Sequence, residues 1–138
     1  ALGSSQLKKL DNFVQKRRKI ARKYDKSFSI IDNFKTPAFN DLFKNAFHLY
    51  PLQIDFQKIN ISKLELFNKM KQSGINLQVH YIPVHLQPFY RKNYRFQKGD
   101  YPISEKFYQN EVSLPVYPDL TIDEQVKVIE NIKKYINV

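Results

Sequence analysis

The sequence predicts a small α+β domain, with a mostly antiparallel three-stranded sheet and helices packed against one of its faces. A chain of 138 residues with 42% hydrophobic side chains is long enough to bury one core. Three short apolar or alternating runs predict strands. About four runs with helical spacing or helix-start signals lie between and around them, and this mixed order favours an α+β architecture.

Residues 1–28 predict a long basic helix that leads into the domain, and residues 29–138 predict the domain itself. From Leu7 to Phe28, apolar side chains recur three, four or seven positions apart, as on one helix face. Residues 8–26 hold nine Lys or Arg against two Asp and contribute +7 of the net charge of +10. The chain does not begin with Met, and we expect it to be cut from a longer sequence.

Residues 29–46 predict a loop. The pairs Asp32-Asn33, Thr36-Pro37 and Asn40-Asp41 favour turns, and a short strand is expected near Ser29 to Ile31.

The stretch from His48 to Phe56 alternates and predicts a half-buried strand, with Tyr50, Leu52 and Ile54 on one side. Pro51 has no amide donor, so we expect this strand to lie at an edge or to carry a bulge.

Ser62 and Glu65 have the spacing of a capping box, which predicts a helix through Lys71 that ends at Gly74. The apolar run Ile75–Ile82 predicts a second strand.

A short helix is expected over Pro102–Glu111, with proline in its first turn, followed by a third strand over Val112–Tyr117. Thr121 and Glu124 form a second capping box, which predicts a final helix. Its apolar stripe is Ile122, Val126, Ile129, Ile132 and Ile136.

The composition excludes several classes of chemistry. Cysteine is absent, which rules out disulfides, thiolate zinc sites and cysteine nucleophiles. The three glycines form no phosphate-binding loop, and no GxSxG turn is present. No apolar run approaches the roughly twenty residues of a membrane helix, so we expect a cytoplasmic protein that does not bind membranes.

Residues 80–96 combine two histidines, five aromatic side chains, two prolines and three basic side chains. This crowding suits a metal site, a nucleic-acid surface, part of an enzyme pocket or a loop over the core. His80 and His85 lack further ligands at a recurrent spacing, so no metal is expected. The basic charge leaves open a free-standing module that binds nucleic acid or an acidic protein, although no base-reading motif is present.

The order of short motifs resembles the C-terminal part of the DegT-type sugar aminotransferases over the whole chain. The motifs are Ala1-Leu2-Gly3 with Gln6–Asp11 and Arg17-Arg18, then His48-Leu49-Tyr50, Gly74-Ile75, His80–Pro88, Pro102 and Glu105, and Ser113–Pro118. Within the family, the likeness is greatest to members that aminate a UDP-keto-sugar for pseudaminic acid.

The resemblance implies the small C-terminal domain of a fold type I aminotransferase. It implies pyridoxal 5'-phosphate as cofactor, L-glutamate as amino donor, a UDP-sugar as acceptor and a homodimer formed through the large domain and the first helix. The Schiff-base lysine, the acidic partner of the pyridine nitrogen and the phosphate cup belong to the large domain in this family. We therefore expect no catalytic or cofactor-binding residue in this chain, and no activity from the chain alone.

By the same resemblance, the loop at residues 80–96 leans over the mouth of the active site. The expected substrate-binding residues are Tyr81, His85, Tyr90 and Tyr94, with Arg91 as a contact to the diphosphate. Aromatic faces pack on sugar rings, and guanidinium groups bind phosphates in pairs of hydrogen bonds. The alternative is that Tyr81, Pro83 and Phe89 only pack the small domain.

Overall fold

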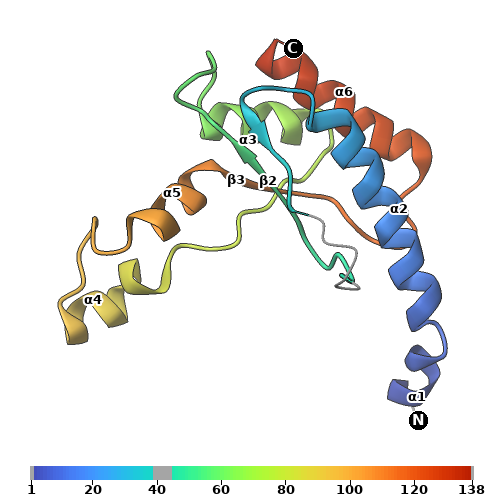
Figure 1. Ribbon diagram of the computed structural model, residues 1–138, viewed down its shortest axis with the longest axis horizontal. Helices are drawn as coiled ribbons and strands as arrows, with labels where there is room; N and C mark the ends of the chain where they lie inside the picture. The colour runs from blue at the N-terminus through green and yellow to red at the C-terminus, as the bar shows by residue number, and fades with distance from the viewer. Residues whose placement is uncertain (1, 39–44, 138) are drawn as a thin grey trace.

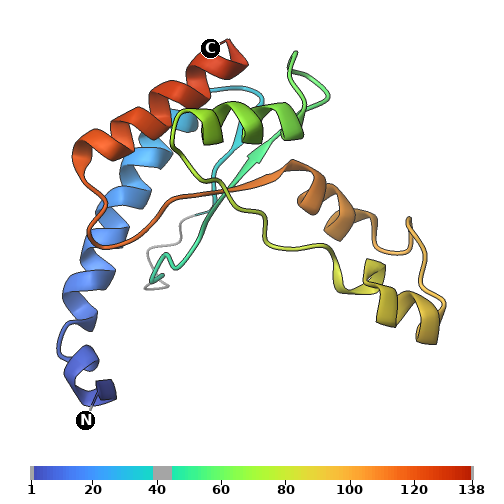
Figure 2. The same cartoon turned by 180° about the vertical axis from the view of Figure 1, so that it is seen from behind.

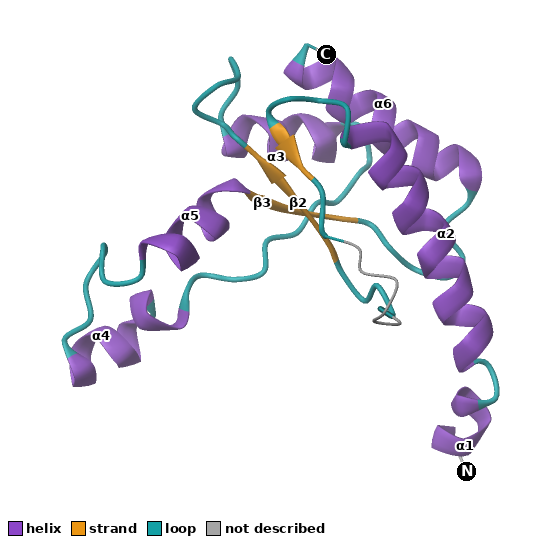
Figure 3. Ribbon diagram, viewed as in Figure 1, coloured by secondary structure: helices purple, strands orange, loops and turns teal. Residues whose placement is uncertain are grey.

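The computed structural model describes residues 2–38 and 45–137, which form a three-stranded sheet surrounded by helices (Figure 3). The strands are β1 (Phe34–Lys35), β2 (Tyr50–Ile54) and β3 (Glu111–Leu114). The helices are α1 (Leu2–Leu7), α2 (Leu10–Phe28), α3 (Lys63–Gln72), the 3-10 turn η1 (Val84–Leu86), α4 (Pro88–Tyr94), α5 (Pro102–Asn110) and α6 (Ile122–Ile136). The predicted α+β class is confirmed.

The sheet has the order β1-β2-β3 and is antiparallel, with Phe34 opposite Ile54 and Tyr50 opposite Leu114. The predicted strand at residues 48–56 is confirmed in its central five residues. Its alternation is confirmed as well, because Tyr50, Leu52 and Ile54 are fully buried while the residues between them are half-buried.

The expectation that Pro51 marks an edge strand or a bulge is wrong, because β2 is the central strand and pairs in register with β3 at this residue. Amide groups along a strand point alternately to the two neighbours. The amide of Asp55 donates to Asn33, on the β1 side, so the nitrogen of Pro51 also faces that side. β1 is only two residues long and does not reach Pro51, so no ladder bond is lost.

The helices α2, α3 and α6 gather on one side of the sheet, and Figures 1 and 2 show the same grouping from opposite directions. Side chains from all three helices join the buried face of β2 in a single core. Tyr24 of α2 donates a 3.0 Å hydrogen bond to the carbonyl of Pro115, and the buried Gln125 of α6 donates to the carbonyl of Ile20. The prediction that helices cover one face of the sheet is confirmed.

Both predicted capping boxes are present and set the starts of α3 and α6. Ser62 accepts from the amide of Glu65, and Thr121 accepts from the amide of Glu124, while each glutamate reaches back to the cap residue. Gly74 has φ of +75° just after α3, the left-handed conformation that ends helices. The predicted helix at residues 102–111 is confirmed as α5, with Pro102 in its first turn.

Three further local predictions need correction. The predicted long first helix is interrupted at Lys8-Lys9, between α1 and α2. No residue of α1 is buried, so no packing contact keeps α1 continuous with α2. Residues 29–31 form a turn, because Ser29 still donates to a carbonyl of α2, and the strand begins at Phe34. The third strand, β3, begins one residue earlier than predicted and ends at Leu114. The predicted turn at Asn40-Asp41 lies outside the described residues.

The predicted strand at residues 75–82 is wrong, since the stretch makes a single bridge from Gln78 to Ser113. The pairing stops because the amide of His80 donates to the side chain of Glu111 at 3.0 Å instead of to a strand backbone. Residues 80–96 also contain η1 and α4, so this stretch is more regular than the predicted loop.

Residues 83–110, here called the arm, comprise η1, α4 and α5 and project away from the sheet (Figures 1 and 2). Within the arm only Pro83, His85 and Glu105 are buried. No helix among the described residues combines the length and apolar character needed to cross a membrane.

Candidate functional site

A buried histidine–carboxylate pair holds the two halves of the arm together. His85 of η1 and Glu105 of α5 are 7% and 6% exposed, and His85 Nε2 lies 2.9 Å from Glu105 Oε1. The same carboxylate oxygen accepts from the backbone amide of Gly99 at 2.8 Å. These bonds tie η1, the connection at Gly99 and α5 to one carboxylate.

The hydrogen bond from His85, followed by that from Gly99, holds the pKa of Glu105 below its usual range. Gly99 itself has φ of +103°, a conformation that side chains with a Cβ rarely adopt. The site therefore favours an ionised carboxylate at residue 105 and a glycine at residue 99.

Aromatic rings continue from this pair along α4. The ring of His85 lies 4.7 Å from that of Tyr101, and Phe96 lies 5.7 Å from Tyr101. Tyr94 stacks between Phe96, at 6.1 Å, and Tyr90, at 6.0 Å. Tyr94 is 61% exposed, so the row presents aromatic surface to solvent.

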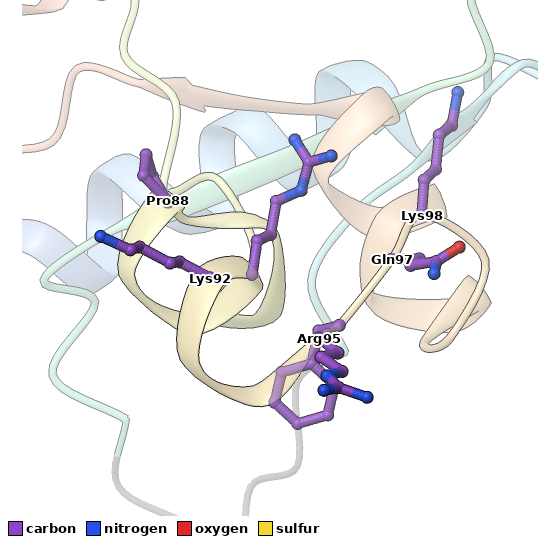
Figure 4. Close-up of a pocket in the computed structure, with 7 residues that line it drawn as sticks. Pro88, Lys92, Arg95, Gln97 and Lys98 are labelled. Atoms are coloured by element: carbon purple, nitrogen blue, oxygen red, sulfur yellow. The ribbon is translucent and has the colours of Figure 1, made fainter.

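A cationic hollow lies beside this row at the tip of the arm. It has a volume of about 840 Å³ and is lined by Pro88, Phe96, Gln97 and four basic residues, Arg91, Lys92, Arg95 and Lys98. Figure 4 shows Lys92 and Arg95 on α4 and at its C-terminal end, with Lys98 on the following connection. None of the described residues that line the hollow carries a carboxylate, so its electrostatic potential favours an anion.

A second hollow, here called the His80 hollow, lies against β3 and has a volume of about 470 Å³. Three stretches of the chain line it: His48 and Leu49, residues 76–81 with His80 and Tyr81, and residues 113–117. Tyr81 is 72% exposed and packs edge-on against the ring of His80 at 4.9 Å.

The five predicted substrate-binding residues do not lie together in one site. Tyr90, Arg91 and Tyr94 lie together on α4, and Arg91 lines the cationic hollow. Tyr81 lines the other hollow, and His85 is buried against Glu105. Whether these residues bind substrate stays a prediction. The buried position of His85, bonded to Glu105, suits a role in holding the two halves of the arm together.

Sequence reasoning did not single out Glu105 and Gly99 as a unit, nor Arg95 and Lys98 as partners of Arg91. The basic pair was visible in the sequence as cations four and seven residues after Arg91. The carboxylate that pairs with His85 follows it by twenty residues, which no local pattern indicates. Among the described residues, no group of three His, Cys, Asp or Glu is placed to hold a metal ion.

Part of the charge of α2 is used within the chain. Lys16 forms an exposed ion pair with Asp119 at 3.4 Å, and Arg18 donates to the carbonyl of Asn45 at 2.9 Å. These contacts connect the helix to the loops at residues 45 and 119, as an ordinary amphipathic helix does.

Comparisons with known proteins agree on one family. The model of the DegT/DnrJ/EryC1/StrS aminotransferase family matches residues 1–133. The spore coat polysaccharide biosynthesis protein SpsC of Bacillus subtilis is 37% identical over 134 residues, which are 96% of this chain and 34% of that protein. The UDP-4-amino-4,6-dideoxy-N-acetyl-beta-L-altrosamine transaminase of Campylobacter jejuni is 35% identical over 144 residues, covering 97% of this chain and 37% of that protein.

A solved structure, that of Helicobacter pylori PseC, an aminotransferase involved in the biosynthesis of pseudoaminic acid, superposes with a TM-score of 0.85 at 28% identity. The match covers 99% of this chain and 36% of that one. The chain thus spans about a third of the length of the proteins that it matches.

Proposed function

Because the chain belongs to the DegT/DnrJ/EryC1/StrS aminotransferase family, we propose that it is the C-terminal part of a sugar aminotransferase. The complete protein would transfer an amino group from L-glutamate to a UDP-keto-sugar, with pyridoxal 5'-phosphate as cofactor. The observation that carries the proposal is the family match over residues 1–133. The likeness to the altrosamine transaminase and to PseC supports pseudaminic acid biosynthesis as the pathway.

Within this function the arm would bind the nucleotide part of the substrate. Among the residues that the structure describes, the cationic hollow offers four basic side chains and no carboxylate, which suits a diphosphate. Tyr90 and Tyr94 stack beside it on α4 and offer aromatic faces to a base or a sugar ring. His85, bonded to Glu105, would position α4 instead of meeting the substrate.

Three lysines are set apart by burial or by lining a hollow, and their surroundings do not suit pyridoxal phosphate. Pyridoxal phosphate, which serves as an electron sink when bound, requires a lysine amine and a partner for its pyridine nitrogen. Burial lowers the pKa of Lys63, but its Nζ donates to the carbonyl of Tyr108 at 2.7 Å and lines neither hollow. Lys92 and Lys98 line the cationic hollow, where no described residue supplies a carboxylate. We therefore propose that the catalytic lysine lies outside this chain, which alone would be inactive.

The test uses the full-length gene product, incubated with L-glutamate and a UDP-4-keto-sugar made by a dehydratase. Mass spectrometry should detect a UDP-amino-sugar whose formation requires both glutamate and pyridoxal phosphate. Absence of any glutamate-dependent amino sugar from a protein loaded with cofactor would contradict the proposal.

A charge variant tests the part assigned to the arm. Arg91→Ala should raise the KM for the nucleotide sugar roughly 12- to 160-fold, since a hydrogen bond to a charged group contributes about 1.5–3 kcal/mol. Lys71→Ala, which removes one exposed cation from the end of α3, is the matched control and should leave the KM unchanged. Equal effects of both changes would show that net charge, and not the cationic hollow, attracts the substrate.

The alternative of a basic module for nucleic acid or an acidic protein gives a different result. Nucleic-acid binding falls steeply with salt concentration because counterions are released. Tight RNA binding with such a slope, together with no amino transfer, would favour that alternative.

A further inference from the structure

Glu111 fastens both connections between the arm and the rest of the molecule. The arm meets the sheet at its root, where residues 80–82 lead outward and residues 108–111 lead back into β3 (Figures 1 and 2). The backbone amide of Glu111 donates to the carbonyl of Phe107 at the end of α5. The side chain of Glu111 accepts from the backbone amide of His80 at 3.0 Å, just before the outgoing connection.

The carboxylate of Glu111 is fully buried and is held by a second bond. Its Oε2 accepts from His80, and its Oε1 accepts from the hydroxyl of Ser113, two residues further along β3. Such a carboxylate keeps its place, because moving it would leave buried donors and acceptors unpaired, which costs free energy. The bond from His80 therefore fixes the start of the outgoing connection against β3.

Lys63, the first residue of α3, makes a further bond to the returning connection. Its Nζ donates to the carbonyl of Tyr108 at 2.7 Å and lies 5.1 Å from the centre of the Tyr108 ring. Tyr108 is in the last turn of α5, where carbonyl groups lack partners within the helix and a cation is favourable. Burial lowers the pKa of Lys63, and the negative charge of Glu111 opposes this effect. Lys63 and Glu111 thus act on the same root.

The direction of the arm depends on this root, because the pair formed by His85 and Glu105 joins the two halves of the arm to each other and not to the sheet. With nine residues, α5 is about 13 Å long, so a rotation of about 10° at the root would move its far end by about 2 Å. Such a displacement is large for an enzyme, since a misplacement of about 1 Å can lower a rate about 100-fold.

We propose that Glu111 is a positioning residue, which sets the direction of the arm and so the place of the cationic hollow relative to the rest of the enzyme. The proposal rests on the proposed function for the reaction and for the nucleotide as occupant of the cationic hollow. The described residues that line this hollow all lie between residues 88 and 98, so the hollow moves with the arm as one unit. Loosening the root should therefore leave nucleotide affinity intact and reduce turnover, because the catalytic lysine is placed outside this chain.

Kinetics of the full-length protein separate positioning from binding. Glu111→Ala removes both acceptor oxygens and should lower kcat for amino transfer roughly 10- to 100-fold, while the Kd for UDP stays unchanged. Glu111→Gln should keep both values, since its amide oxygen can accept from His80 and its amide hydrogens can be donated to Ser113. Arg91→Ala, in the cationic hollow, should show the opposite division, with a weaker Kd for UDP and little change in kcat.

A distance measurement reads the direction of the arm and needs no activity. The 138-residue chain has no cysteine, so spin labels can be attached at Asn93→Cys on α4 and Glu130→Cys on α6, with any upstream cysteine replaced by serine. Double electron–electron resonance, with excess unlabelled protein to suppress distances between subunits, gives the distribution of label distances in the full-length protein. Glu111→Ala should shift or broaden this distribution by about 2 Å or more. Lys63→Met, which removes the donor to α5, should do the same, whereas Lys71→Met, exposed on the same helix, should not.

The outcomes distinguish this proposal from the function on which it rests. An unchanged distance distribution in both Glu111→Ala and Lys63→Met overturns the positioning role, even if amino transfer is observed. A loss of UDP affinity that parallels the loss of turnover in Glu111→Ala overturns it as well, because it indicates a general structural effect. If circular dichroism shows that Glu111→Ala does not fold, Lys63→Met is compared with Lys63→Arg, which keeps a donor, in the same measurements. A shifted arm in the variants, together with no amino transfer by the unaltered protein, overturns the proposed function and leaves the role of Glu111 standing.

Discussion

Replacing Gly99 by alanine should loosen the arm while leaving the core intact. Gly99 has φ of +103°, and a Cβ added there would meet no atom within 4 Å, so the strain is confined to the backbone. Such conformations cost about 1–3 kcal/mol for residues other than glycine. At 1.4 kcal/mol per factor of ten, local opening of the arm should become roughly 5- to 140-fold more frequent.

Hydrogen exchange of backbone amides, followed by mass spectrometry on the full protein, measures this opening. Peptides from residues 84–110 should lose protection by that factor, and peptides from α2 and α6 should not. Gly74→Ala is the matched control, because its φ of +75° closes α3 and its effect should appear there. Gly3→Ala should leave both regions unchanged. Unchanged exchange in the arm of Gly99→Ala would refute the role assigned to Gly99.

Three further predictions concern stability. Tyr24→Phe, which removes the hydrogen bond to Pro115, should lower the free energy of unfolding by about 1 kcal/mol, seen as a lower urea midpoint by circular dichroism. Thr121→Ala should cost about 1 kcal/mol by the same measurement through loss of the capping box of α6, whereas Thr121→Ser should not. The lowered pKa of Glu105 stabilises the arm above the ordinary carboxyl value and ceases to do so as the pH falls through the lowered one. Protection factors in the arm should therefore fall as the pH drops below the ordinary carboxyl pKa and through the lowered pKa of Glu105, and Glu105→Gln should flatten that dependence.

The sequence correctly predicted those parts of the fold that depend on contacts between residues close together in the chain. The two capping boxes fixed the starts of α3 and α6 to the residue, because the bonds involved span only three positions. The alternation at residues 50–54 identified the buried side of β2 for the same reason. In contrast, the run at residues 75–82 has the composition of a strand but pairs only at Gln78. The backbone amide of His80 instead donates to the side chain of Glu111, which is distant in sequence.

The candidate site was predicted less well because its important contacts are long-range. The sequence pointed to residues 80–96 and to His85, but not to Glu105, the partner of His85 that lies twenty positions further along the chain. The sequence did not identify the partners of His80, because Glu111 and Ser113 lie more than thirty positions away on β3. The resemblance to a family supplied the function that these patterns alone did not.

The two hollows differ in how firmly the fold holds them, and this difference should be visible in kinetics. The His80 hollow is built on β3, whose four residues are all buried, whereas the arm buries only three side chains in total. Regions with few buried contacts open most readily. Changes in the cationic hollow should therefore act mainly on capture of the nucleotide and on its salt dependence, because phosphate contacts are electrostatic.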